Sequence, residues 1–118
     1  MRLRVENVTR GCILADRAER ASSFLQRLIG LLGRASLHAG EGLLLTPCNA
    51  VHTFFMRMAI DVAFLDAEGV VLRQVGALPP WRATPVQQGA RSVLELPAGT
   101  LKASGTREGD RLHFEPAG

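Results

Sequence analysis

The spacing of hydrophobic positions changes along the chain, and each spacing predicts a different element. Over residues 3–8 apolar and polar residues alternate with period two, which is typical of a strand with one buried face. Arg10-Gly11 predicts a turn, and residues 12–15 form a second short apolar run. Residues 3–15 are therefore predicted to form a hairpin.

A helical period follows over residues 22–33. Apolar residues recur there at three- and four-residue spacing and give one apolar face: Phe24, Leu25, Leu28, Ile29 and Leu32. Ser23 and Gln26 have the spacing of a capping box, and Gly33 is a suitable C-terminal stop. We predict one amphipathic helix whose apolar face packs on a sheet.

The remainder of the chain is rich in short strand patterns separated by turn residues. The predicted strands are residues 43–45, 51–56, 60–65, 70–75, 92–96 and 111–114. A loop is predicted over residues 79–90, and a short helix or turn over residues 100–104. This spacing predicts a mostly-β α+β domain over residues 1–118, a small barrel-like or sandwich domain with the helix packed on it.

Composition agrees with one small globular domain. The chain has 118 residues, of which 47% are hydrophobic and 21% charged. No apolar run approaches the roughly 20 residues that cross a bilayer. The first residues lack the apolar segment of a signal peptide, so we expect a cytoplasmic location. Two cysteines are too few for a disulfide scaffold.

The net charge of +3 is unevenly distributed. Residues 1–34 carry seven arginines against three acidic residues, whereas the rest of the chain is slightly acidic. A basic N-terminal third can meet nucleic acid or an acidic partner. Because it shows no tight basic cluster with interleaved aromatic residues, a solvated face is favoured, and weak nucleic-acid binding is kept as a minor alternative.

Most of the candidate chemistry lies in one stretch, residues 47–61. Cys48 and His52 are four residues apart, which places them on one face of a strand, and a thiolate needs a neighbouring base or cation. Cys48 as nucleophile, His52 as base and Arg57 as anion clamp would form a small hydrolase or transferase site. However, Pro47 suggests that Cys48 lies in a turn, and no third orienting residue is evident.

Two other interpretations of this stretch remain open. Cys48 and His52, with Asp61 or Glu95, offer metal-ligand chemistry, but a structural zinc site takes four ligands in paired spacings. His38 and His113 are far away in sequence, so no metal site is predicted. The structural interpretation has the largest share: Asp61 accepts main-chain hydrogen bonds or pairs with Arg57.

Two further positions stand out. Trp81-Arg82 follows Pro79-Pro80 in the long loop and contains the only tryptophan of a chain without tyrosine. An exposed Trp-Arg pair is typical of a binding hot spot, and a lid that packs on the barrel mouth is equally compatible. Glu95 alternates with Leu94 and Leu96, which predicts that it faces solvent. No phosphate loop, dinucleotide motif or nucleophile elbow is present, and no cofactor is predicted.

Several segments together resemble one known family. They are Gly30-Leu31-Leu32, Glu41-Gly42-Leu43-Leu44-Leu45, His52-Thr53-Phe54-Phe55-Met56-Arg57, Ile60-Asp61-Val62-Ala63-Phe64-Leu65-Asp66 and Val93-Leu94-Glu95-Leu96-Pro97-Ala98-Gly99. The chain resembles the DUF 192 family of uncharacterised bacterial and archaeal proteins over about residues 8–115. The resemblance implies a compact barrel-like domain with a packed helix, and it implies no activity. Other members have a Trp-Met-Lys-Asn-Thr-type sequence at residues 55–59, so the polar Asn-Thr pair is missing here.

From these residues we predict a non-enzymatic module that binds a small ligand or a peptide, or that takes part in assembly. Its polar site would be built around His52, Arg57 and Asp61. Trp81, Arg82 and Glu95 are further candidates for ligand contacts. The expected partner is a small anionic ligand or a protein, and the oligomeric state is left open.

Overall fold

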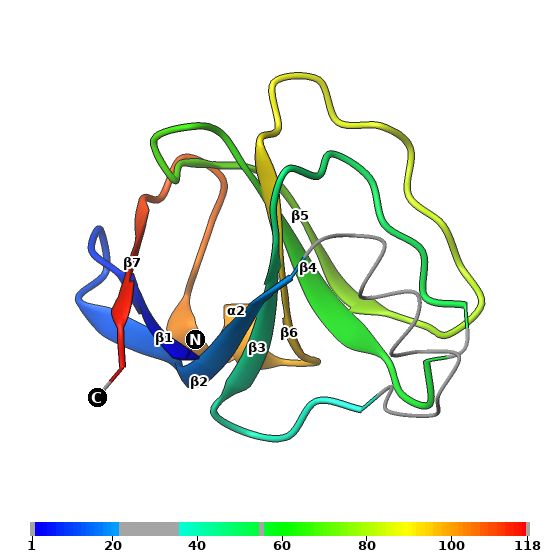
Figure 1. The fold of residues 1–118 in the computed structure, drawn as a ribbon, viewed down its shortest axis with the longest axis horizontal. Coiled ribbons are helices and arrows are strands. Elements are labelled where there is room, and N and C mark those ends of the chain that lie inside the picture. Colours follow the sequence, from blue (N-terminus) through cyan, green and yellow to red (C-terminus); the bar gives the residue numbers. More distant parts are fainter. Residues whose placement is uncertain (1, 22–35, 55, 118) are drawn as a thin grey trace.

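The computed structural model describes residues 2–21, 36–54 and 56–117, and the predicted helix over residues 22–33 lies outside them. Within these residues the chain forms one curled sheet of seven strands (Figure 1). The elements are β1 (Arg2–Asn7), β2 (Cys12–Ala21), β3 (Glu41–Leu45), β4 (Ile60–Leu65), β5 (Val71–Leu78), β6 (Ser92–Pro97), α2 (Thr100–Ser104) and β7 (Leu112–Pro116).

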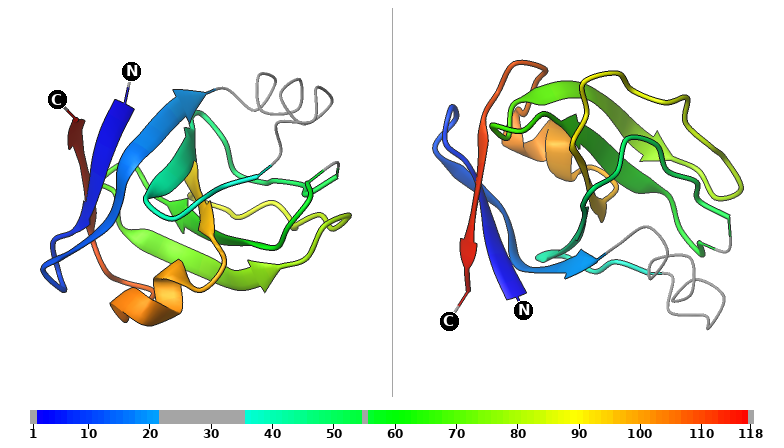
Figure 2. Two further views of the ribbon diagram at one scale, coloured as in Figure 1. Left: turned by 90° about the horizontal axis from the view of Figure 1, so that it is seen from below. Right: turned by 45° about the horizontal axis from the view of Figure 1, so that its top comes forward.

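The sheet has the strand order β5-β4-β6-β3-β2-β1-β7. β2 and β3 pair in parallel, and the other neighbouring strands of this sheet pair antiparallel. Figure 2 shows that the sheet curves into a half-barrel, with β7 and β1 on one side and β4 and β5 on the other. The prediction of a mostly-β, barrel-like fold is confirmed.

Two clusters of buried side chains fill the two sides of the central strands. The first cluster gathers Leu3, Val5, Leu94 and Leu96 with Leu101 of α2. The second cluster includes Ile60, Val62, Phe64 and Val93, and also Val51 from the segment between β3 and β4. Because β4 and β6 contribute to both clusters, their outward-facing positions are covered as well as their inward-facing ones. This double burial explains the near-continuous apolar sequence of β4.

Most of the predicted strands lie where the pattern placed them. The hairpin of β1 with β2 and the strand β4 are confirmed, and β4 pairs antiparallel with β5. Two strands are longer than predicted, since β2 continues to Ala21 and β5 to Leu78. The loop over residues 79–90 is also confirmed.

The prediction of a strand over residues 51–56 is wrong. The described residues of this segment, 51–54 and 56, make a single bridge, from His52 to Ala83, and are otherwise a loop. Its neighbour is the loop that contains Pro79, Pro80 and Pro85. Proline has no main-chain N–H to give to a ladder, so the pairing of these two segments cannot extend into a regular strand.

The helix α2 is a single short turn between two glycines in left-handed conformation. Gly99 has φ 94° and Gly105 has φ 69°, a conformation that glycine adopts without strain. α2 packs beside β2 and β6 and buries Leu101. In the part of the chain that the structure describes, no helix has the length and hydropathy needed to span a membrane.

Candidate functional site

Two loops, residues 46–59 and 79–91, run side by side at the β4–β5 side of the half-barrel (Figure 1). Main-chain hydrogen bonds join them along their length. The N–H of Thr84 donates to the Val51 carbonyl at 2.9 Å, and the N–H of Gln87 donates to the Asn49 carbonyl at 2.9 Å. We call these two segments the paired loops. The bonds give them a defined shape although they contain only one bridge of regular sheet.

The hydroxyl of Thr53 is the centre of this pairing. Thr53 is fully buried, and its Oγ1 donates to the Pro79 carbonyl at 2.6 Å and accepts from the Arg82 N–H at 2.9 Å. Its main chain donates to the Arg82 carbonyl at 2.7 Å and accepts from the Trp81 N–H at 3.1 Å. One buried residue therefore fixes the backbone on both sides of Trp81.

Three aromatic rings form a row on the paired loops. The ring centroids of His52 and Phe54 are 4.9 Å apart, and those of Phe54 and Trp81 are 5.8 Å apart. Phe54 and Trp81 are 41% and 59% exposed, whereas His52 is half-buried. We call this row the aromatic ledge. Most of the Trp81 side chain is therefore exposed, and its ring stacks on Phe54.

The charge of the paired loops has one sign. They contain three arginines, Arg57, Arg82 and Arg91, and no aspartate or glutamate. All three arginines are exposed. Among the acidic side chains that the structure describes, none forms an ion pair with them. The paired loops therefore carry a net positive charge, and Arg82 directly follows Trp81 of the ledge.

Asp61, predicted to belong to the polar site, is buried on β4 and held by main-chain donors. Its Oδ1 accepts from the Ala77 N–H at 2.8 Å, and its Oδ2 accepts from the Leu101 N–H at 2.9 Å. Ala77 has φ 51°, an uncommon value for a residue with a side chain. Asp61 thus connects β4 with the irregular end of β5 and the first turn of α2, as the structural interpretation of the sequence expected.

Glu95 does not face solvent, so that part of the sequence prediction is wrong. It is 1% exposed on β6, opposite Leu43 of β3 and Val62 of β4. Alternation does point Glu95 away from Leu94 and Leu96, but β6 lies in the interior of the sheet and both of its faces are covered. Alternation alone cannot distinguish a solvated face from a second buried face.

Cys48 lies in a loop, as Pro47 suggested, and its thiol is in an unfavourable place for a nucleophile. The Sγ donates to the Ala50 carbonyl at 3.1 Å. Burial raises the pKa of the Cys48 thiol, and the negative charge of Glu95 raises it further. A raised pKa keeps the thiol protonated at neutral pH, whereas a catalytic cysteine needs its thiolate.

The described residues do not bring together the donors of the metal interpretation. No three His, Cys, Asp or Glu side chains among residues 2–21, 36–54 and 56–117 are placed to hold a metal ion. Asp61 is turned toward α2, and the other two histidines of the chain, His38 and His113, are exposed on other elements.

A second polar centre was missed by the sequence analysis. Asn7 is fully buried and donates from Nδ2 to Thr106 Oγ1 at 2.9 Å and to Asp110 Oδ2 at 3.1 Å. Arg10 pairs with the same carboxylate at 2.9 Å, and these contacts lower the pKa of Asp110 to about 2, with the Arg10 hydrogen bond as the largest cause. We call this group the Asn7–Asp110 network. The Gly109-Asp110 turn was the only signal of it in the sequence.

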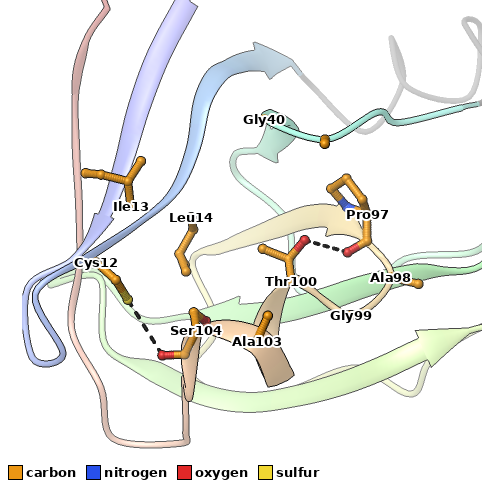
Figure 3. A pocket seen from close by; sticks show the side chains of 11 residues that line it. Cys12, Ile13, Leu14, Gly40, Pro97, Ala98, Gly99, Thr100, Ala103 and Ser104 are labelled. Carbon is orange, nitrogen blue, oxygen red and sulfur yellow. Dashed lines mark hydrogen bonds between the residues drawn. The ribbon is translucent and has the colours of Figure 1, made fainter.

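A shallow cavity of about 580 Å³ lies between β2, α2 and the residues that join β6 to α2 (Figure 3). Its polar side chains are tied to the protein itself. Thr100 Oγ1 donates to the Pro97 carbonyl at 2.7 Å, Ser104 Oγ donates to the Leu101 carbonyl at 3.0 Å, and the Cys12 thiol points to the Ser104 carbonyl at 3.6 Å. No residue predicted for the functional site lines this cavity.

Comparison with known proteins places the chain among uncharacterised relatives. A UPF0127 protein of Pyrococcus furiosus is 35% identical over 111 residues, which cover 92% of this chain and 95% of that protein. A UPF0127 protein of Pyrococcus abyssi is 37% identical over 101 residues, with 83% and 86% covered. These names state no activity.

Two crystal structures share the fold. A protein of unknown function from Novosphingobium aromaticivorans has a TM-score of 0.76 at 21% identity, covering 96% of this chain and 84% of that one. A protein from Sinorhizobium meliloti, whose name proposes a transcription regulator, has a TM-score of 0.78 at 24% identity, covering 96% and 92%. The sequence matches the DUF192 family, described as uncharacterized ACR, over residues 5–114. The chain therefore belongs to the DUF192 family, as its motifs indicated.

Proposed function

We propose that this protein is a non-enzymatic binding module and that the aromatic ledge is its binding surface. The ligand is anionic and carries an apolar or flat group that contacts the rings. The observation that carries the proposal is Trp81, which is 59% exposed and held at φ 62°.

The backbone of Trp81 supports a binding role for its side chain. A bulky residue at positive φ costs on the order of 1–3 kcal/mol, and such residues cluster at ligand-binding and active sites. The bonds from Thr53 to the main chain of Trp81 and Arg82 hold this conformation. The indole stacks on Phe54 and yet stays 59% exposed, and this combination of a strained backbone and an exposed ring supports a role in binding.

The arginines define the chemistry of the ligand. Arg82 directly follows Trp81, and Arg57 lies three residues after Phe54. A guanidinium offers several N–H donors that suit a carboxylate or a phosphate. Trp and Arg are also the residues most enriched in binding hot spots. A ligand with an anionic group beside a ring or apolar group uses both features at once.

The proposed surface contains some of the residues predicted for the polar site and leaves out others. His52, Arg57, Trp81 and Arg82 are assigned to the surface, whereas Asp61 and Glu95 are buried in the sheet and are left out of it. The raised pKa of Cys48 makes the cysteine-dependent hydrolase or transferase the less favoured alternative.

The fluorescence of the protein tests the proposal directly. Trp81 is the only tryptophan and the chain has no tyrosine, so the emission comes from the ledge itself. We would titrate the protein at low salt with a panel of anionic ligands: an acidic peptide, mononucleotides, a single-stranded oligonucleotide and a sulfated oligosaccharide. At least one should change the emission and protect Trp81 from acrylamide quenching. If none binds, the ledge is not an anion-binding surface and the proposal is wrong.

A further inference from the structure

We propose that the ligand of the aromatic ledge is a single-stranded nucleic acid. Its bases would stack on Trp81 and Phe54, and its phosphates would contact the arginines of the paired loops. This inference rests on the proposed function, since it names the ligand of the same surface.

The two most exposed rings offer flat surface to unpaired bases. The centroid of Phe54 lies 4.9 Å from that of His52 and 5.8 Å from that of Trp81. Phe54 and Trp81 stack on each other at an interplanar angle of 27° and stay 41% and 59% exposed, so a base can stack on the part of each ring that this contact leaves open. Proteins that hold single strands without sequence preference present such aromatic platforms, because every base has a flat face that stacks.

The charges supply the second half of this recognition. The paired loops hold three exposed arginines and no acidic residue, so nothing in these segments repels a phosphate. A basic surface that follows the backbone, combined with stacking rings, is the usual design for binding single strands. In the sequence Arg57 and Arg82 belong to separate segments, and the hydrogen bonds between the loops bring those segments together.

A single strand fits these features better than the alternatives. In a duplex the bases are already stacked on one another, so exposed rings on a loop have no free base to contact. An acidic peptide would form ion pairs with the arginines. Its carboxylates are not aromatic, however, and would not stack on the exposed parts of the rings. A free mononucleotide offers one base and would engage only part of the row.

The first experiment measures Trp81 emission during titration with a short oligothymidylate. We expect quenching that saturates, and binding that weakens as salt rises. For contacts with three phosphates, the slope of log K against log salt should be about −2. The same titration with a matching duplex, with thymidine monophosphate and with an acidic peptide compares the other ligand classes.

Variants separate stacking from charge, with binding followed by the anisotropy of a labelled oligonucleotide. Trp81→Ala should weaken binding by about tenfold or more, and Trp81→Phe should recover most of it because a flat ring remains. Arg82→Gln should weaken binding and reduce the salt slope by about one contact. Arg107→Gln is the matched control, because Arg107 is an exposed arginine outside the paired loops and should bind like the wild type.

Each other outcome contradicts the inference in a recognisable way. If the acidic peptide binds and the oligonucleotide does not, the proposed function stands and the single-strand inference is wrong. Equal affinity for duplex and single strand, or for monophosphate and oligonucleotide, also overturns it. If Arg107→Gln weakens binding as much as Arg82→Gln, the attraction is a general effect of net charge and not of the ledge. If no ligand binds, both proposals are wrong.

Discussion

This small protein contains two polar centres, and their buried polar side chains have different roles. The Asn7–Asp110 network joins β1 to the segment before β7 and keeps its groups among themselves: Asn7, Asp110 and Arg10 satisfy one another. Thr53 is buried just as completely, but its bonds go to the main chain around Trp81. The residues that Thr53 positions are exposed.

The difference teaches which polar residues to associate with function. A network whose polar groups bond to one another is explained by its contribution to the stability of the fold, since buried polar groups must find partners. Stability alone does not explain a buried group that holds an exposed ring at an uncommon backbone angle. The second pattern is the one that we attach to binding, and mutations in the two centres should behave differently.

The largest effect is expected from Asn7→Ala. Removing the amide breaks the hydrogen bonds of Asn7 to Thr106, to Asp110 and to the Arg10 N–H. It also opens a small cavity. We expect the free energy of unfolding in urea to fall by about 3 kcal/mol. The emission of Trp81 and its quenching by acrylamide should not change, because the network lies outside the paired loops.

Val8→Ala is the control for this substitution. Val8 adjoins Asn7 in sequence but is exposed, so its truncation should change stability by no more than about 0.5 kcal/mol. If Asn7→Ala altered the environment of Trp81 as well, the two centres would be coupled and the comparison between them would fail.

Thr53→Val should show the reverse pattern. Valine keeps the branched shape but cannot bond to the Pro79 carbonyl or accept from the Arg82 N–H. We expect a smaller loss of stability, about 2 kcal/mol, with easier quenching of Trp81 as its backbone loses support. Thr53→Ser keeps the hydroxyl and should keep the wild-type quenching. Equal quenching in Thr53→Val and the wild type would show that Thr53 does not position the ledge.

The sequence pattern predicted the sheet because burial repeats along a strand. The limits of β4 were predicted to the residue, and α2 lies where a short helix or turn was predicted. The errors came from tertiary context. The segment after Val51 has a good strand pattern, but its neighbour is rich in proline, so the two segments form separate hydrogen bonds and not a regular ladder. Glu95 follows the expected alternation, yet its face of β6 is covered by the curl of the sheet.

The candidate site was predicted only in part for a related reason. His52, Arg57, Trp81 and Arg82 were chosen as candidates because each is an unusual residue in its segment, and their role in binding stays a proposal. Asp61 was recognised as buried, but a sequence cannot show that its oxygens are taken by Ala77 and Leu101, which lie far along the chain. Thr53 drew no attention, because an ordinary threonine becomes the centre of the site only through bonds to residues 79–82.

The smallest effect is expected from Asp110, and it depends on pH. The folded protein lowers the pKa of Asp110 from 3.8 to about 2, so the ionised carboxylate stabilises the fold. This contribution is complete above pH 3.8 and is lost as the pH falls from there to about 2. Because Arg10 is 37% exposed, water screens the pair and keeps the contribution below that of Asn7.

The measurement compares urea unfolding of the wild type and Asp110→Asn across this pH range. The difference in unfolding free energy should be constant from neutral pH down to about pH 4 and should shrink toward pH 2, where about half of the wild-type carboxyl groups are protonated in the folded protein. Thr53→Val should show no such dependence, since a hydroxyl does not titrate there. A difference for Asp110→Asn that stayed constant to pH 2 would mean that shape and hydrogen bonding, and not charge, hold the Asn7–Asp110 network. The two polar centres would then differ only in what they position.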